Sequence, residues 1–237
     1  MSKQFLAVII TIILVFVGVV VISNKSSNSG SSKKSSNSTL TQHVEGKGTT
    51  GVTLVEYGDY QCPYCEQYYS TVKQAQTEFG DQIKFQFRNF PLVSLHRNAF
   101  AAARAAEAAS LQGKFWQMHD ALYEPSNWQV WTSASDPSSN FVQLAQQLGL
   151  NVQQFKTDFA SDQVNSLVNA DMAEGNKLGI DGTPTFFVDG KQVQIANSLG
   201  DFEKVIKAEI AKKQPASQTS SSTPAAAQTT SSAASSQ

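Results

Sequence analysis

Two cysteines, Cys62 and Cys65, are the only ones in the chain, and Pro63 and Tyr64 separate them. The thiolate is the reactive form of cysteine, and the pKa of the thiol sets how much of it is present. The pair follows an apolar, strand-like segment at residues 52–57 and opens a segment with helical spacing. Cys62 would stand at a helix N-terminus, where free N–H groups and the helix dipole favour an anion. We therefore expect Cys62 to be exposed and acidic, with Cys65 near enough to form a disulfide with it.

Two other uses of these cysteines have to be weighed. They could form a purely structural disulfide, or they could supply half of a zinc site together with His43, His96 or His119. No second C-x-x-C and no paired-histidine motif supports a zinc site. A C-x-x-C between a strand and a helix is far more specific for redox chemistry than the motif alone.

Glu56 is a further candidate for chemistry, because it is a carboxylate within the apolar segment and lies six residues before Cys62. Burial of a carboxylate is costly and raises its pKa. Glu56 could therefore be a proton acceptor near the two cysteines, or it could simply face outward from the strand. Alternation along the strand does not decide between the two.

The composition excludes some classes of protein. The formal net charge is −1, and all 19 acidic residues lie after residue 40. A domain with this balance has no basic surface for nucleic acid. We expect no nucleic-acid partner, no cofactor and no metal site.

The two ends of the chain do not have a globular composition. Residues 5–22 are apolar and about as long as a membrane-spanning helix, so we favour an uncleaved membrane anchor at residues 1–22 over a cleaved signal peptide. Residues 23–42 are Ser-rich and predict a flexible linker, and residues 214–237 predict a disordered tail. The folded domain at 43–213 would lie on the extracytoplasmic side, or would be secreted if the signal is cleaved. A disulfide persists there.

The folded segment alternates between strand and helix patterns. Residues 82–90 predict a strand with Ile83, Phe85 and Phe87 on its covered face and Arg88 on the other. Helical patterns follow at 95–111, 114–123, 140–148, 152–159 and 161–178. Residues 125–137, with two tryptophans, predict a loop. Residues 183–188 and 191–195 predict a hairpin, and 201–212 a last helix.

This order predicts an α/β protein with a thioredoxin-like fold and an inserted helical domain at about residues 95–178. Four motifs also resemble those of the DsbA-like thiol-disulfide oxidoreductases, in their membrane-anchored bacterial group. They are VEYGDYQCPYC, FRNFPL, QGKFWQMHDALY and GIDGTPTFFVDGK. The resemblance covers about residues 44–212.

The resemblance implies roles for individual residues. Cys62 corresponds to the attacking cysteine and Cys65 to the buried resolving cysteine. Thr183-Pro184 corresponds to a loop whose proline is cis and faces the two cysteines, and where the backbone of Thr183 would pair with a bound peptide. Pro63 and Tyr64 would also contact substrate. Glu56 matches the buried acid of the family, which favours a role in proton transfer.

The function implied is the oxidation of exported protein thiols through a Cys62–Cys65 redox pair, with a membrane reoxidase as partner. The sequence departs from the best-known oxidants of the family, which carry histidine where this chain has Tyr64. Tyrosine cannot become a cation, so one source of thiolate stabilisation is missing. A reductase or isomerase on the same fold, and a non-catalytic metal-carrying dithiol module, remain as alternatives.

Overall fold

The computed structural model describes residues 40–213. The predicted membrane segment at 5–22, most of the predicted linker and the predicted tail at 214–237 lie outside the described residues. Within residues 40–213, no helix is both long enough and apolar enough to cross a membrane.

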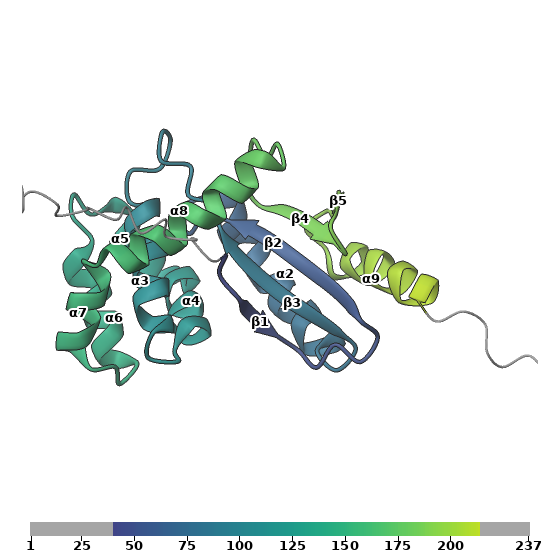
Figure 1. Ribbon diagram of the computed structural model, residues 1–237, viewed down its shortest axis with the longest axis horizontal. Coiled ribbons are helices and arrows are strands. Elements are labelled where there is room, and N and C mark those ends of the chain that lie inside the picture. Colours follow the sequence, from purple (N-terminus) through teal and green to yellow (C-terminus); the bar gives the residue numbers. More distant parts are fainter. Residues whose placement is uncertain (1–39, 214–237) are drawn as a thin grey trace, which may run out of the picture. The chain divides into compact units, whose positions relative to one another are not determined.

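A five-stranded sheet with the order β1-β3-β2-β4-β5 forms the centre of the domain (Figure 1). β2 and β3 are parallel, and the other neighbouring pairs are antiparallel. β2 has strands on both sides and is mostly buried, as expected from its apolar sequence. The strands are β1 (His43–Glu45), β2 (Val52–Gly58), β3 (Ile83–Asn89), β4 (Thr185–Val188) and β5 (Lys191–Val193).

The register of β2 and β4 brings two distant parts of the chain to one edge of the sheet. Tyr57, near the end of β2, pairs with Thr185 at the start of antiparallel β4. The residues that follow β2 and the residues that precede β4 must therefore lie side by side. This edge is where the two cysteines and Thr183-Pro184 meet.

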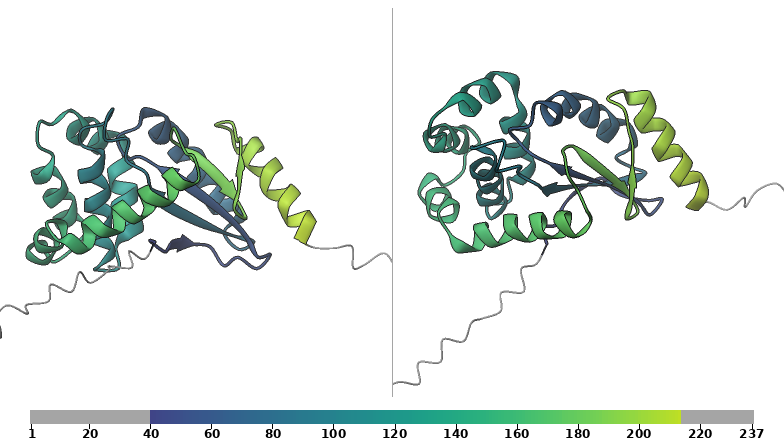
Figure 2. Two further views of the ribbon diagram at one scale, coloured as in Figure 1. Left: turned by 45° about the horizontal axis from the view of Figure 1, so that its top comes forward. Right: turned by 90° about the horizontal axis from the view of Figure 1, so that it is seen from above.

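Helices cover both faces of the sheet. α2 (Pro63–Phe79) and α9 (Leu199–Lys213) share one apolar cluster with the sheet, which includes Phe79, Phe85 and Phe202. α8 (Asp162–Lys177) runs along the opposite face, as the right-hand view of Figure 2 shows. The close approach of α8 depends on Gly175, because a Cβ there would meet the ring of Phe90 at 2.5 Å.

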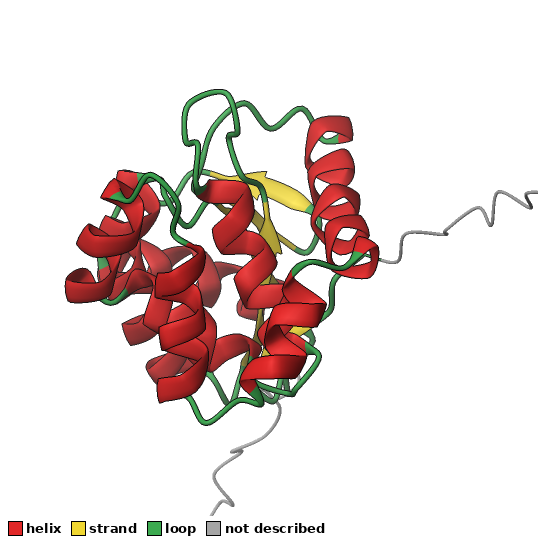
Figure 3. Cartoon of the chain, turned by 90° about the vertical axis from the view of Figure 1, so that its left-hand side faces the viewer, coloured by secondary structure: helices red, strands yellow, loops and turns green. Residues whose placement is uncertain are grey.

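The predicted helical insertion gathers at one end of the sheet, and its helices stand in front of much of the sheet when viewed from that side (Figure 3). Its core is alanine-rich and closely packed around fully buried Trp131 and Phe141. Besides α8, its helices are α3 (Ala99–Ser110), α4 (Phe115–Tyr123), α5 (Pro125–Ser133), α6 (Ser138–Gln147) and α7 (Val152–Phe159).

The predicted loop at residues 125–137 is wrong for its first nine residues, which form α5. Pro125 occupies the first turn, where its missing N–H is not needed. Trp131 is fully buried and donates from Nε1 to the carbonyl of Leu122 at 2.9 Å, while Trp128 donates to the carbonyl of Tyr60 at 2.8 Å. These tertiary contacts outweigh the weak helical propensity of the segment.

A buried polar cluster joins the end of β3 to α8 of the insertion. Arg88 lies on the face opposite Phe87, as predicted, but that face is covered as well. Arg88 is 8% exposed and donates to the carboxylate of Asp171 on α8 at 3.1 Å. The same carboxylate accepts from the backbone of Asn89 and from the hydroxyl of Thr41, at 3.0 and 2.6 Å. β1 was not predicted, and its His43 imidazole contacts the carboxylate of Glu107 at 2.8 Å.

Candidate active site

Cys62 is the N-cap residue of α2, with extended backbone angles and Pro63 directly after it. Its N–H donates to the carbonyl of Asp59 at 3.0 Å, and its carbonyl accepts from the N–H of Glu66 at 3.1 Å. These bonds fix the position of the sulfur at the helix start, as predicted. The expectation that Cys62 is exposed is wrong, because the residue is only 4% exposed.

The cover over Cys62 comes from the loop before β4. The thiol of Cys62 donates to the carbonyl oxygen of Thr183, with a sulfur-to-oxygen distance of 3.3 Å. The Thr183–Pro184 peptide bond is cis, as the resemblance implied. The loop and the sulfur thus face each other at the sheet edge, and a groove of about 290 Å³ begins beside them, along Thr183–Phe186 and Gln192–Ile195.

The two thiols have pKa values shifted in opposite directions. The pKa of Cys62 falls from 9.0 to about 5, chiefly because the Cys65 thiol donates a hydrogen bond to its thiolate. Burial opposes this shift, while the Thr183 hydroxyl and the backbone N–H groups of Tyr64 and Cys65 add to it. Burial raises the pKa of Cys65 well above its ordinary value, and the bond to Cys62 adds to that effect. Near neutral pH the reduced pair therefore consists of a Cys62 thiolate and a Cys65 thiol.

Asp59, which no sequence pattern marked as a candidate, organises the turn that carries the cysteines. Its buried carboxylate accepts from the N–H groups of Gln61 and Leu92 at 2.7 and 2.8 Å and contacts Nδ1 of His96 at 2.7 Å. Its own N–H donates to the sulfur of Cys65 at 3.5 Å. The signal in the sequence was an aspartate two residues before Gln61, a spacing typical of an Asx-turn.

Glu56 is 9% exposed, so the buried interpretation of this strand residue is correct. Its pKa is raised from 4.5 to about 8, first by burial and then by the negative charge of Cys62. A carboxyl group with this pKa can give or take a proton near neutral pH. Its charge interacts with those of both Cys62 and Cys65, which fits a role in proton transfer that stays a prediction.

Two groups of predicted residues remain, the substrate-binding residues next to Cys62 and the histidines weighed as zinc ligands. Pro63 and Tyr64 are exposed beside the sulfur of Cys62, and Tyr64 is 65% exposed. The three histidines weighed as zinc ligands contact carboxylates at three different places. In the part of the chain that the structure describes, no group of three or more His, Cys, Asp or Glu residues could hold a metal ion.

A family model described as Thioredoxin matches residues 38–208, which is most of the chain. The chain belongs to the thioredoxin family. A thioredoxin-like oxidoreductase from Silicibacter pomeroyi DSS-3 is 28% identical, with a TM-score of 0.60 over 73% of this chain and 93% of its own. Oxidised BdbD from Bacillus subtilis is 26% identical, with a TM-score of 0.58 over 71% of this chain and 92% of its own. The resemblance of this chain to the DsbA-like thiol-disulfide oxidoreductases is confirmed, and its membrane-anchored part stays a prediction.

The thioredoxin domain also resembles part of a much longer curated protein. It is 36% identical to the Na(+)/H(+) antiporter NhaA 1 of Mycolicibacterium gilvum over 152 residues, and these residues make up 63% of this chain. The alignment spans 24% of the antiporter. The relative's name therefore describes a protein of which this chain matches about a quarter.

Proposed function

We propose that the chain is a thiol-disulfide oxidoreductase that introduces disulfides into exported proteins. The observation that carries the proposal is the opposite shift of the two thiol pKa values, to about 5 for Cys62 and well above the ordinary value for Cys65. An attacking thiolate next to a protonated resolving thiol is the arrangement that dithiol–disulfide exchange needs. The thioredoxin-like oxidoreductase among the solved structures supports the same class of reaction.

In the proposed reaction, a substrate thiolate attacks the sulfur of Cys62 in the disulfide form. The Cys62–Cys65 bond breaks, and the sulfur of Cys65 leaves as a thiolate that takes a proton from Glu56. A second substrate thiolate then attacks the substrate sulfur of the mixed disulfide and releases Cys62 as its stable thiolate. The substrate loses two electrons, which the enzyme gains as it becomes a dithiol.

Reoxidation reverses these steps and gives Glu56 the role of base. The thiolate of Cys62 attacks a partner disulfide, and Cys65 must then lose its proton to attack Cys62. Once Cys62 is in a mixed disulfide its negative charge is gone, and this charge is one of the causes that raise the pKa of Glu56. Glu56 therefore ionises more readily at the step that needs a base.

The low pKa of Cys62 supports the oxidising direction. Thioredoxin has a thiol pKa near 7 and a reduction potential of about −270 mV. A pKa of about 5 stabilises the dithiol further at pH 7, which raises the potential by ~50 mV, to about −220 mV. A higher potential means a better oxidant.

The location and partners also belong to this proposal. The apolar segment at 5–22 would hold the domain at the extracytoplasmic side of the cell membrane, where exported thiols are its substrates. A membrane reoxidase would accept the two electrons. The groove beside Thr183 and Pro184 would take the substrate as an extended peptide.

The reduction potential of the full chain against glutathione tests the direction. A value near −220 mV or higher supports a dithiol oxidase, whereas a value at or below the −270 mV of thioredoxin contradicts it. A Cys62→Ser variant that kept full exchange activity would contradict any role of this pair in catalysis.

A reductase or isomerase is the second candidate, and it is favoured by one observation. Tyr64 occupies the position beside the thiolate where a histidine cation would raise the potential further. Trapping the thiols in cells with an alkylating reagent separates the two candidates. A mostly oxidised pair agrees with an oxidase, and a mostly reduced pair agrees with a reductase.

A further inference from the structure

His119 is a buried titratable group that the proposed reaction does not use. It lies on α4, is 4% exposed and is enclosed by aromatic rings. The rings within about 6 Å of its own belong to Tyr60, Tyr69, Phe87, Phe115, Trp116 and Tyr123. An aromatic residue would fill such a space at no desolvation cost, so an imidazole there calls for an explanation.

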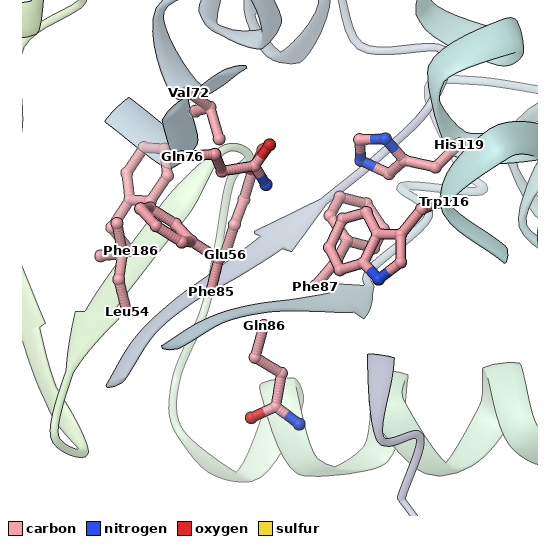
Figure 4. Close-up of a pocket in the computed structure, with 10 residues that line it drawn as sticks. All are labelled: Leu54, Glu56, Val72, Gln76, Phe85, Gln86, Phe87, Trp116, His119 and Phe186. Atoms are coloured by element: carbon pink, nitrogen blue, oxygen red, sulfur yellow. The ribbon is translucent and has the colours of Figure 1, made fainter. Parts of the chain in front are cut away.

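Glu56 and His119 line the same pocket, together with Gln76 of α2 (Figure 4). The figure shows the amide of Gln76 and the imidazole of His119 approaching from opposite sides. The centre of a water molecule can occupy about 10 Å³ of this pocket. By this measure the pocket is about large enough for one water. The buried Oε1 atom of Gln76 has no hydrogen-bond partner among the described residues, so it can accept a bond from that water.

The far side of His119 leads to the surface. Its Nδ1 lies 3.2 Å from Oδ1 of Asp120, whose Oδ2 lies 3.1 Å from Nζ of Lys73. The side chains of Asp120 and Lys73 are 37% and 35% exposed. If Nδ1 donates to the carboxylate, Nε2 carries the lone pair and can accept a proton on the pocket side.

Burial favours a neutral imidazole at His119. Burial lowers the pKa of His119, as do the charges of Lys73 on α2 and His43 on β1, while Asp120 opposes them. Burial alone would raise the pKa of Asp120, but His119 and Lys73 outweigh it and lower that pKa. A neutral imidazole between a neutral acid and an ionised carboxylate is suited to receive a proton on one nitrogen and release one from the other.

We propose that His119 passes protons between Glu56 and Asp120, by way of one water held at Gln76. The inference rests on the proposed base role of Glu56. During reoxidation, the proton of Cys65 moves to the Glu56 carboxylate and then through the water to Nε2 of His119. The proton on Nδ1 leaves to Asp120 and from there to solvent. His119 acts through Glu56 and does not touch the sulfurs, so it is a positioning residue.

The formation of the Cys62–Cys65 disulfide, here called closure, is the step in which Cys65 loses its proton. Its rate therefore tests this proton transfer. The reduced full chain is mixed with oxidised glutathione, and the formation of the Cys62–Cys65 disulfide from the glutathione mixed disulfide is followed by rapid acid quench across a pH series. We expect His119→Gln to slow closure on the order of tenfold near neutral pH and to shift the midpoint of the pH profile. Trp116→Phe, which alters the same pocket without a titratable group, is the matched control and should change neither.

Further variants keep the test decisive if His119→Gln loses stability. Gln76→Leu leaves the histidine in place but removes the partner of the water, and it should slow closure in the same direction. Glu56→Gln combined with His119→Gln should be no slower than Glu56→Gln alone, because both residues serve one path.

Three outcomes distinguish the proton path through His119, here called the relay, from the proposed function. If Glu56→Gln slows closure but His119→Gln matches Trp116→Phe in rate and pH profile, the relay is wrong and the base role of Glu56 stands. If Glu56→Gln leaves the profile unchanged, both ideas are wrong. If the wild-type chain forms no mixed disulfide with glutathione, the proposed function itself is wrong.

Discussion

The sulfur of Cys62 lies 3.3 Å from the carbonyl oxygen of Thr183, a residue 121 positions further along the chain. The parallel pairing of β2 with β3 and the antiparallel pairing of β2 with β4 bring these residues to one sheet edge. Since the Thr183 hydroxyl is one cause of the low pKa of Cys62, part of this pKa shift depends on the pairing of β2 with β4.

Removal of the resolving thiol should trap the mixed disulfide and also reveal what lowers the pKa of Cys62. The largest cause is the hydrogen bond from Cys65, so Cys65→Ala should raise the pKa of Cys62. Cys65→Ser keeps a donor and should stay closer to the wild-type value of about 5. Thiolate absorbance during a pH titration measures both. Equal pKa values in the two variants would contradict the assigned cause.

The raised pKa of Glu56 should lower the stability of the dithiol form as pH rises, while the lowered pKa of Cys62 acts in the opposite direction. The carboxyl stays protonated in the folded protein up to about pH 8 but ionises near 4.5 when unfolded. Folding then takes up a proton at Glu56, so the contribution of this group to the free energy of unfolding falls by ~1.4 kcal/mol per pH unit between these values. Glu56→Gln should remove this slope and gain up to ~3 kcal/mol at pH 7, as measured by urea unfolding at several pH values.

The disulfide form is the internal control for that experiment. It lacks the Cys62 thiolate, whose charge is the second cause of the Glu56 shift, so the pH-dependent difference in stability between wild type and Glu56→Gln should be smaller there. An unchanged pH dependence in the dithiol form of Glu56→Gln would be evidence against a protonated Glu56.

Tyr64→His should make the protein a stronger oxidant. The side chain is 65% exposed, so the substitution should fold normally. A histidine cation beside the thiolate lowers the pKa of Cys62, and each unit raises the reduction potential by about 30 mV. Glutathione equilibration measures the potential, and Tyr64→Phe should leave it near the wild-type value. A Tyr64→His potential no higher than that of Tyr64→Phe would refute the electrostatic explanation.

Asp171→Asn should destabilise the fold without altering the thiols. The carboxylate is fully buried and accepts hydrogen bonds from Arg88, Asn89 and Thr41. Loss of its charge leaves Arg88 without its buried partner, at a cost of about 3 kcal/mol or more. Denaturant unfolding measures the loss, and exposed Asp162→Asn on the same helix should cost under about 1 kcal/mol. Similar losses in both variants would argue against the importance of the cluster.

The parts of the fold that could be predicted are those with a local pattern. The alternation of Ile83, Phe85 and Phe87 identified β3, and the C-x-x-C before a helical segment identified the start of α2. Pro125–Ser133 was predicted as a loop because its helix depends on two tryptophans that bond to Leu122 and Tyr60, contacts that no local pattern contains.

The candidate site was predicted in part for the same reason. The cysteines and Thr183-Pro184 stand in recognisable motifs. Burial of Glu56 remained open because it depends on packing from both sheet faces. The arrangement of Asp59 with His96, 37 residues later, and of Glu56 with His119 exists only in three dimensions.

The distance of Thr183 from Cys62 along the chain also has a consequence for biosynthesis. At ribosomal rates of about 5–20 residues per second, 121 residues take roughly 6 to 24 seconds to add. During that interval a nascent chain carries both cysteines without the loop that covers Cys62. Until the loop is made, the pKa of the Cys62 thiol lacks the contribution of the Thr183 hydroxyl and depends only on groups within residues 62–65.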